Sequence, residues 1–299
     1  MHSSNSGFDI SVVVPLFNKE KFVERALNSI LQQTILPNKI IIVDDGSTDG
    51  SNEIALRIKK RFGDLIYIHK QTNAGVSVAR NKGLELADSK FVAFLDADDE
   101  FHSNFIEKAK ALIEDYPSNV IYGFGYQRFG EDSSKNHIRG EVDFFKLYCE
   151  RNQCPLSASS VVIDKESVGN NLFPVGYGMG EDILAWLKIL AKGHSLILDS
   201  TPVAIYHHDD LSSAVLNPVA KNEPCFLKSN IMQQFNGTYY KRFIRYHTSD
   251  YIKSHILYGN RCFVFKYILR KGGYYLKFLP LLLIPKKIII YKVSKNNLK

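Results

Sequence analysis

Short apolar runs alternate with segments of helical spacing along the first part of the chain. Uninterrupted β-branched and aromatic runs predict strands that are buried on both faces, at 10–16, 39–43, 65–69 and 91–95. Apolar residues recur at helical spacing between and after them, over 20–33, 52–61, 76–87 and 103–115. This rhythm predicts an α/β fold whose mostly parallel, right-handed βαβ sheet is flanked by helices.

Polar residues suggest where these helices begin. Asn18 is placed to cap the first helix, Ser47 or Thr48 the second, and Ser103 the fourth. Beyond residue 116 the rhythm loosens, and a glycine-rich loop at 176–180 precedes a helix over 181–191. The remaining expected elements are a polar loop at 130–140 and strands at 120–129, 159–163, 196–198 and 203–206.

A cluster of acids directly follows the fourth predicted strand. Side chains two positions apart at a strand end point the same way, so Asp96 and Asp98 can face one ligand. Open α/β sheets bind ligands at this edge, and Mg²⁺ or Mn²⁺ favours one or two carboxylates completed by substrate phosphates. The alternative is a solvated turn in which Asp98 or Asp99 caps a following helix.

Two further segments fit the same nucleotide interpretation. Asp44 and Asp45, after the second strand, could accept hydrogen bonds from a base or ribose, or could simply form a turn and helix cap. The 73–75 turn, with Arg80 and Asn81 beyond it, supplies cations and amides near a helix start, which suits a diphosphate. An exposed helix with a basic face is the plainer alternative.

Acids and histidines later in the chain are also open to two interpretations. Glu181 and Asp182 could stabilise a helix N-terminus, or one of them could act as a general base placed by the glycine loop. His207 and His208 follow a predicted strand and could be ordinary surface residues, or could approach a metal or phosphate.

Taken in order, the stretches VVVPLFN, VDDGSTDG, NAGVSVARNKG, FLDADD, GEDI and YHH resemble the family 2 glycosyltransferases of GT-A fold. The resemblance covers about residues 9–215. It implies an inverting, metal-dependent enzyme that moves a sugar from a nucleotide-sugar, by default a UDP-sugar, to a hydroxyl of a glycan or lipid-linked acceptor in bacterial-type surface polysaccharide synthesis. The single tryptophan, Trp186, lies outside any QxxRW motif, so one sugar is expected per encounter.

The resemblance also assigns roles to individual residues. Asp182, with Glu181 beside it, matches the catalytic base. The expected metal ligands for Mn²⁺ or Mg²⁺ are Asp98, Asp96 and one of His207 and His208. The implied nucleotide-sugar residues are Pro15, Phe17, Asn18, Asp44, Asp45, Asn73, Gly75, Arg80, Asn81, Asp96, Ala97 and Asp98.

The charge is distributed unevenly along the chain. Residues 1–220 hold 22 Lys+Arg against 29 Asp+Glu, whereas residues 221–299 hold 16 against 2 and nine of the sixteen tyrosines. Mixed basic, tyrosine and aliphatic side chains near the C-terminus suit an anionic membrane surface, although they would also suit a helical cap with a solvated basic face. We therefore expect a disordered 1–8, a catalytic domain at 9–218 with a nucleotide-sugar half (9–100) and an acceptor half (101–218), and a basic helical extension at 219–299.

Location and rival functions complete the expectations. The four cysteines lack metal or CxxC spacing, no apolar run is long enough to span a membrane, and no signal core is visible, which favours a cytoplasmic enzyme on the inner membrane face. No nucleic-acid partner is expected. The rivals are a nucleotidyltransferase, disfavoured because 15–20 lacks a glycine-rich phosphate loop, and a non-catalytic nucleotide- or nucleic-acid-binding module.

Overall fold

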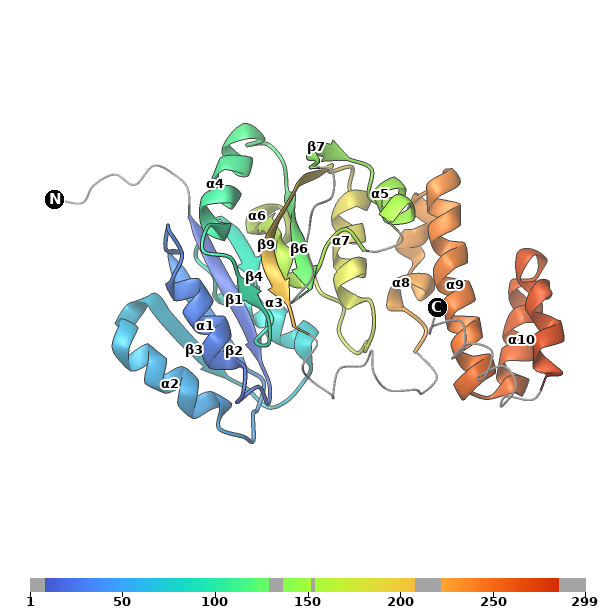
Figure 1. Cartoon of the computed structure of the whole chain (residues 1–299), viewed down its shortest axis with the longest axis horizontal. Coiled ribbons are helices and arrows are strands. Elements are labelled where there is room, and N and C mark those ends of the chain that lie inside the picture. The colour runs from blue at the N-terminus through green and yellow to red at the C-terminus, as the bar shows by residue number, and fades with distance from the viewer. Residues whose placement is uncertain (1–8, 129–136, 152–153, 208–221, 285–299) are drawn as a thin grey trace. The chain divides into compact units, whose positions relative to one another are not determined.

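The computed structural model describes residues 9–128, 137–151, 154–207 and 222–284. The chain divides into two compact units, residues 1–209 and 210–299, and each is considered by itself. The expected domain boundary near 218 and the expected disordered 1–8 lie outside the described residues. The 1–209 unit is built on one sheet flanked by helices (Figure 1).

Nine strands form that sheet in the order β3-β2-β1-β4-β8-β6-β9-β5, with β7 paired to β9. The first four are parallel neighbours, as predicted, and β8 then runs antiparallel between β4 and β6. The strands are β1 (Ile10–Leu16), β2 (Lys39–Asp44), β3 (Ile66–Lys70), β4 (Phe91–Phe94), β5 (Glu100–Phe101), β6 (Ile121–Arg128), β7 (Arg139–Val142), β8 (Val161–Asp164) and β9 (Leu196–Tyr206).

Helices cover the sheet in this unit (Figure 1). The predicted helices over 20–33, 52–61, 76–87, 103–115 and 181–191 are all present, with ends that shift by up to three residues. They are α1 (Val23–Leu31), α2 (Ser51–Phe62), α3 (Val76–Leu86), α4 (Phe105–Asp115), α5 (Phe144–Arg151), α6 (Lys165–Val168) and α7 (Glu181–Ala191), with 3-10 turns η1 (Gly63–Leu65) and η2 (Ala158–Ser160).

Strand β1 shows how the sequence positions both layers. Val12 and Val14 pack with the apolar faces of α1 and α2 in the main core cluster. Val13 points to the opposite face, where α3 approaches so closely that a Cβ on Gly83 would overlap the Val13 side chain. Each fully buried aliphatic side chain contributes roughly 1.5–3 kcal/mol, so this two-sided burial fixes α3, and with it Arg80, against the sheet.

Several local predictions were wrong. Asn18 does not cap α1, which begins at Val23 after Phe22; instead its Oδ1 accepts from Thr48 N at 2.8 Å, with Asn18 in the left-handed region at φ 51°. The N-caps of α2 and α4 are Gly50 and Asn104, neither with a side-chain cap bond, in place of Ser47, Thr48 or Ser103.

The later elements also differ from expectation. The strands expected at 196–198 and 203–206 are one strand, β9, whose register with β6 shifts at Gly125. The polar loop expected at 130–140 gives way to β7 from Arg139, and residues 129–136 lie outside the described part of the chain. Ser159 and Ser160 belong to η2, ahead of β8.

The described part of the 210–299 unit, residues 222–284, is helical and has its own small core. Tyr251, Ile256, Val264, Tyr267 and Phe278 are among its buried members. Among its described residues no helix is long and apolar enough to cross a membrane. Its elements are α8 (Cys225–Lys228), η3 (Asn230–Gln234), α9 (Thr238–Tyr258), α10 (Arg261–Lys271) and η4 (Gly273–Leu282).

Candidate active site

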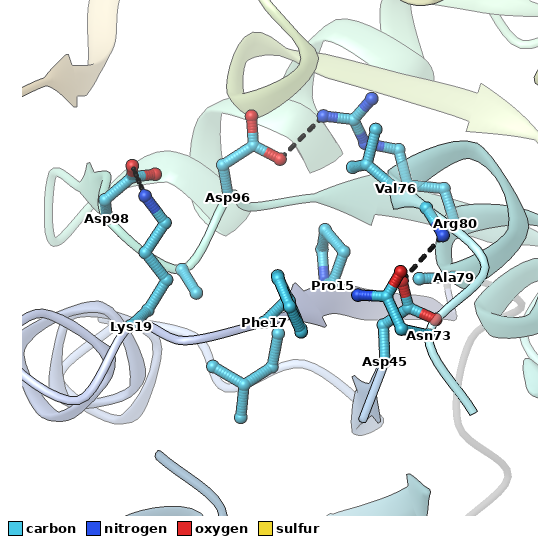
Figure 2. Close-up of a pocket in the computed structure, with 13 residues that line it drawn as sticks. Pro15, Phe17, Lys19, Asp45, Asn73, Val76, Ala79, Arg80, Asp96 and Asp98 are labelled. Carbon is cyan, nitrogen blue, oxygen red and sulfur yellow. Dashed lines mark hydrogen bonds and ion pairs between the residues drawn. The ribbon is translucent and has the colours of Figure 1, made fainter. Parts of the chain in front are cut away.

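A cavity of about 480 Å³ opens at the carboxyl ends of β1 and β4 (Figure 2). Parallel strands of an open α/β sheet present their ligand sites at this edge. Nine of the twelve residues predicted to bind the nucleotide-sugar line it. The full lining is Pro15, Leu16, Phe17, Lys19, Asp45, Asn73, Gly75, Val76, Ala79, Arg80, Asp96, Ala97 and Asp98.

Asp45 organises one wall of the cavity. Its Oδ1 accepts from Gln71 Nε2 at 2.8 Å and from Ala74 N at 2.9 Å, and its Oδ2 accepts from Gly75 N at 2.8 Å. These bonds fold the 71–75 segment over the strand end. Gly75, at φ 95°, then begins α3, so Asp45 sets the position of the first turn of that helix beside the cavity.

Three of the predicted binding residues do not line the cavity. They form hydrogen bonds with segments next to it instead. Asp44 is fully buried; its Oδ1 accepts from Ser47 N at 2.8 Å, which makes the turn that the plainer interpretation expected. Asn81 exchanges two hydrogen bonds with the Phe173 backbone, at 2.8 and 2.9 Å. Asn18 joins the 47–48 turn, as described above.

The acid cluster after β4 forms the opposite wall. No helix follows it directly, because β5 intervenes and α4 is preceded by Asn104, so the alternative in which Asp98 or Asp99 caps a helix was wrong. Figure 2 shows the carboxylates of Asp96 and Asp98, each beside its own cation. Asp96 Oδ1 lies 2.7 Å from Arg80 Nη2, and Asp98 Oδ2 lies 2.7 Å from Lys19 Nζ.

Arg80 links the acid cluster to helix α7. The buried guanidinium bonds Asp96 through Nη2 and lies 3.3 Å from Glu181 Oε1 through Nη1. Burial alone would lower its pKa, but the carboxylates of Asp96 and Glu181 raise the pKa above its usual value, so the group stays charged. It also stacks 5.3 Å from the Phe173 ring centroid, which fixes its plane.

Glu181 and Asp182 begin α7, directly after Gly180 in the left-handed region at φ 76°. Burial raises the pKa of Asp182 to about 6, the neighbouring Glu181 carboxylate adds to the rise, and Arg80 opposes it. A carboxyl group poised near neutral pH suits proton transfer. Neither residue is among the described residues that line the cavity; Arg80 joins them to it.

Asp99 is buried beneath the cluster. It accepts from Ser159 Oγ at 2.7 Å and from His207 N at 3.4 Å. Burial raises its pKa to about 8, and the Asp96 charge adds to the rise. Ser159 Oγ in turn accepts from Asp96 N at 3.1 Å, so Asp99 and Ser159 together shape the acidic loop from below.

His207 is held within hydrogen-bond reach of a carboxylate. The buried imidazole Nε2 lies 2.6 Å from Glu100 Oε1. The same Glu100 oxygen lies 3.0 Å from Arg25 Nε, and Arg25 Nη2 donates to the Asp98 carbonyl at 2.6 Å. His207 is thereby connected to the acidic loop. His208 lies outside the described residues.

The described residues contain no group of three or more His, Cys, Asp and Glu side chains that could hold a metal by themselves. The acidic loop nevertheless contributes two carboxylates to the cavity, from Asp96 and Asp98, in addition to Asp45 on the other wall. Hard oxygen donors, one or two from the protein with phosphates completing the shell, are what Mg²⁺ and Mn²⁺ bind. The residues present therefore fit a cation that arrives with a diphosphate.

Four residues near the acidic loop were not singled out from the sequence: Lys19, Arg25, Glu100 and Ser159. Lys19 and Arg25 lie where an amphipathic helix commonly has basic residues, so they carry no special signal. Ser159 lies 60 positions beyond Asp99, so its contact with Asp99 cannot be read from the local sequence. Only Glu100, which extends the acid run by one position, carried a local signal.

Comparisons with known proteins identify the family. Residues 11–163, just over half of the chain, match Glycosyl transferase family 2. The chain therefore belongs to glycosyl transferase family 2.

Among curated relatives, glycosyltransferase GlyA of Streptococcus pneumoniae is 36% identical over 141 residues, 46% of this chain and 20% of that protein. The putative teichuronic acid biosynthesis glycosyltransferase TuaG of Bacillus subtilis is 30% identical over 187 residues, 62% of this chain and 73% of TuaG. The chain spans only about a quarter to a third of the length of several other curated relatives that it matches.

Solved structures show the same architecture. S. aureus TarS 1–349 in complex with UDP-GlcNAc has a TM-score of 0.61 at 20% identity, covering 92% of this chain and 78% of that one. The mannosyltransferase PcManGT from Pyrobaculum calidifontis, in complex with GDP-Man and Mn²⁺, has a TM-score of 0.60 at 15% identity, covering 97% and 80%. These likenesses establish the predicted GT-A fold.

Proposed function

We propose that the protein transfers one sugar from a nucleotide-sugar to a hydroxyl of a glycan or lipid-linked acceptor during surface polysaccharide assembly. The observation that carries the proposal is the joining of three groups at one cavity. The Asp45 loop lies on one wall, the carboxylates of Asp96 and Asp98 lie on the other, and Arg80 reaches from Asp96 to Glu181, the residue next to Asp182. The likeness to TuaG supports a polysaccharide product.

UDP is the carrier we propose, with GDP as the next candidate. TarS was solved with UDP and UDP-GlcNAc, whereas PcManGT was solved with GDP-Man. In this chain the nucleoside would lie against Pro15 and Phe17, near the Asp45 loop. Phe17 is 43% exposed, which leaves its ring face accessible for a base to cover.

The diphosphate would lie across the Asp96 and Asp98 side of the cavity. A Mn²⁺ or Mg²⁺ ion held there by these two carboxylates would supply Lewis-acid stabilisation to the departing diphosphate. Solved relatives of this fold that carry Mn²⁺ support that part of the proposal. Lys19 and Arg80, already at the two carboxylates, are the protein cations closest to the same charge.

Asp182 is the base in this proposal. The acceptor hydroxyl gives its proton to the Asp182 carboxylate while its oxygen attacks the anomeric carbon from the face opposite the diphosphate. The bond to the diphosphate breaks in the same displacement, so the anomeric configuration inverts. The charges of Glu181 and Arg80 act on the pKa of the base in opposite directions, Glu181 raising it and Arg80 lowering it.

Non-processive action is part of the proposal. Trp186, the single tryptophan, is fully buried and packs 5.7 Å from Phe173 and 6.5 Å from Phe94 between ring centroids. Its side chain is part of the buried core and has no exposed surface with which to contact a sugar. An enzyme that adds one sugar per encounter needs no extended groove to hold a growing polymer.

We further propose that the basic 210–299 unit brings the enzyme to an anionic membrane surface, where a lipid-linked acceptor is held. Its described residues, 222–284, include ten Lys and Arg residues but only two Asp and Glu residues. Clustered basic residues are attracted to anionic lipid, at about 1 kcal/mol for each residue near the surface.

A donor screen tests the function. Thermal unfolding is measured with UDP, GDP and their sugars, each with and without Mn²⁺. A ligand at a hundred times its dissociation constant adds about 2.7 kcal/mol to the free energy of unfolding, which raises the melting temperature measurably. We expect one nucleotide-sugar to stabilise the protein only with Mn²⁺. Stabilisation by nucleoside triphosphates alone would favour a nucleotidyltransferase instead.

A further inference from the structure

Helix α10 and the following η4 segment expose an unusual density of large apolar side chains. Phe265 and Leu269 are 47% and 51% exposed, and Leu276 and Leu283 are 44% and 87% exposed. Residues of α10 and η4 share one small core, so these two elements pack against each other. Exposed apolar side chains that gather on a surface mark sites of interaction with proteins or membranes. The two elements are also joined by a hydrogen bond, which Arg261 Nη1 donates to the Leu282 carbonyl at 2.8 Å.

The apolar and basic residues of α10 lie on defined faces. Val264, Tyr267 and Ile268 are buried in the small core, and they share one face at helical spacing. Phe265 and Leu269, four residues apart, form a neighbouring stripe that is exposed. Lys266 and Arg270 follow them by one position each, so a basic stripe runs alongside the apolar one.

The positive charge of this segment disfavours a second copy of the chain as its partner. Residues 261–284 contain five Lys+Arg and no Asp or Glu. A second copy of the chain would bring two such surfaces together, and like charges at an interface cost several kcal/mol. The partner should carry negative charge for the basic stripe and an apolar interior for the apolar stripe. An anionic bilayer has both properties.

We propose that Phe265, Leu269, Leu276 and Leu283, flanked by Lys266 and Arg270, are the α10–η4 patch through which the protein inserts into an anionic lipid bilayer. The apolar side chains enter the headgroup region while the basic groups remain at the level of the phosphates. This deepens the membrane part of the proposed function, and it needs no glycosyl transfer to be tested. Its failure therefore leaves the transfer chemistry standing.

Vesicle flotation of the full-length chain is the experiment. Binding is compared between phosphatidylcholine vesicles and vesicles that also contain phosphatidylglycerol. We expect binding to the anionic vesicles, at least tenfold weaker in Phe265→Ser/Leu269→Ser, which removes apolar insertion. We expect a loss of about fivefold for each charge in Lys266→Gln/Arg270→Gln. Both variants alter exposed residues, and Phe265→Ser/Leu269→Ser should unfold as the unaltered protein does. Lys266→Gln/Arg270→Gln also removes the contact of the Arg270 guanidinium with the Tyr267 ring, at 5.3 Å from its centroid, which should cost no more than about 1 kcal/mol.

A matched control lies on the other unit. Leu56 is 50% exposed on α2 and Lys60 is an exposed neighbour on the same helix, so Leu56→Ser/Lys60→Gln changes the same kinds of residue elsewhere. This control should bind vesicles as the unaltered chain does. The proposal is overturned if anionic vesicles do not bind, or if the two α10 variants bind as tightly as the control.

Two other outcomes would also overturn it. A concentration-dependent dimer in light scattering that Phe265→Ser/Leu269→Ser abolishes would assign the patch to a second copy. Binding of single-stranded RNA that is lost in the same variant, without vesicle binding, would assign it to nucleic acid.

Discussion

Lys19 Nζ lies 2.7 Å from Asp98 Oδ2, so this carboxylate, like that of Asp96 beside Arg80, is paired with a protein cation. Both side chains are about a quarter exposed, and the pair lies at the cavity wall in Figure 2. A cation that binds Asp98 must compete with this ammonium. The lysine would then be available to the diphosphate that accompanies the cation.

The first prediction concerns this competition. Lys19→Met keeps the length of the side chain but removes its charge, so Asp98 should bind Mn²⁺ more tightly in the absence of nucleotide. A partly exposed ion pair contributes up to about 1 kcal/mol, which corresponds to an increase of about fivefold in affinity. Titration calorimetry with Mn²⁺ alone measures it. Lys21→Met, an exposed neighbour, should leave the affinity unchanged; equal values for both variants would contradict the competition.

The second prediction concerns pH. Asp182 must be ionised to accept a proton, and burial raises its pKa to about 6. kcat/KM should therefore rise tenfold per unit below about pH 6 and level off above it. Because Arg80 lowers this pKa, Arg80→Gln should move the midpoint upward, whereas Arg80→Lys should largely restore it. A profile with the same midpoint in all three proteins would remove Arg80 as the group that tunes the base.

The third prediction separates chemistry from binding. Asp182→Asn keeps the shape of the side chain but cannot take a proton, so transfer should fall by at least a hundredfold, within the range that general-base catalysis contributes. Donor affinity should stay within about twofold, because Asp182 does not line the cavity among the described residues. Turnover by this variant at the normal rate would mean that another residue is the base.

The fourth prediction concerns the close approach of α3 to β1. A Cβ at Gly83 would overlap Val13, so Gly83→Ala should destabilise the protein by about 1–3 kcal/mol, as overpacked cores do. It should also weaken donor binding, since α3 carries Arg80. Urea unfolding measures the first effect. Glu85→Ala on the exposed side of the same helix should change stability by no more than about 0.5 kcal/mol. Replacing a helical glycine by alanine by itself favours the helix by about 1 kcal/mol, so an unchanged or increased stability in Gly83→Ala would contradict the close packing against Val13.

The parallel half of the fold followed from the sequence because its signals are local. Uninterrupted apolar runs such as Val12–Val14 must be buried on both sides, and the helices between them show the matching spacing. β9 was divided in two because Asp199 to Pro202 resembles a turn, yet the strand continues there through a register shift opposite Gly125. Only the pairing with β6, distant in sequence, holds it as one strand.

The site was predictable to the same extent. Asp45, Asp96 and Asp98 lie at strand ends, and strand ends of a parallel sheet meet by topology alone. The partners of those acids come from tertiary packing: Lys19 approaches Asp98 from 79 positions away, and Arg80 reaches Glu181 across 101. Asn18 was expected to cap a helix but bonds Thr48 in the next loop, a contact that no local pattern carries.

The most direct test of the central claim is calorimetric binding of the nucleotide-sugar selected by the donor screen, with and without Mn²⁺, to the unaltered chain and to Asp98→Asn. We expect tight binding only with Mn²⁺, and a loss of at least tenfold in the variant. Equal affinity in the variant, or binding indifferent to Mn²⁺, would contradict a cation held by the acidic loop after β4.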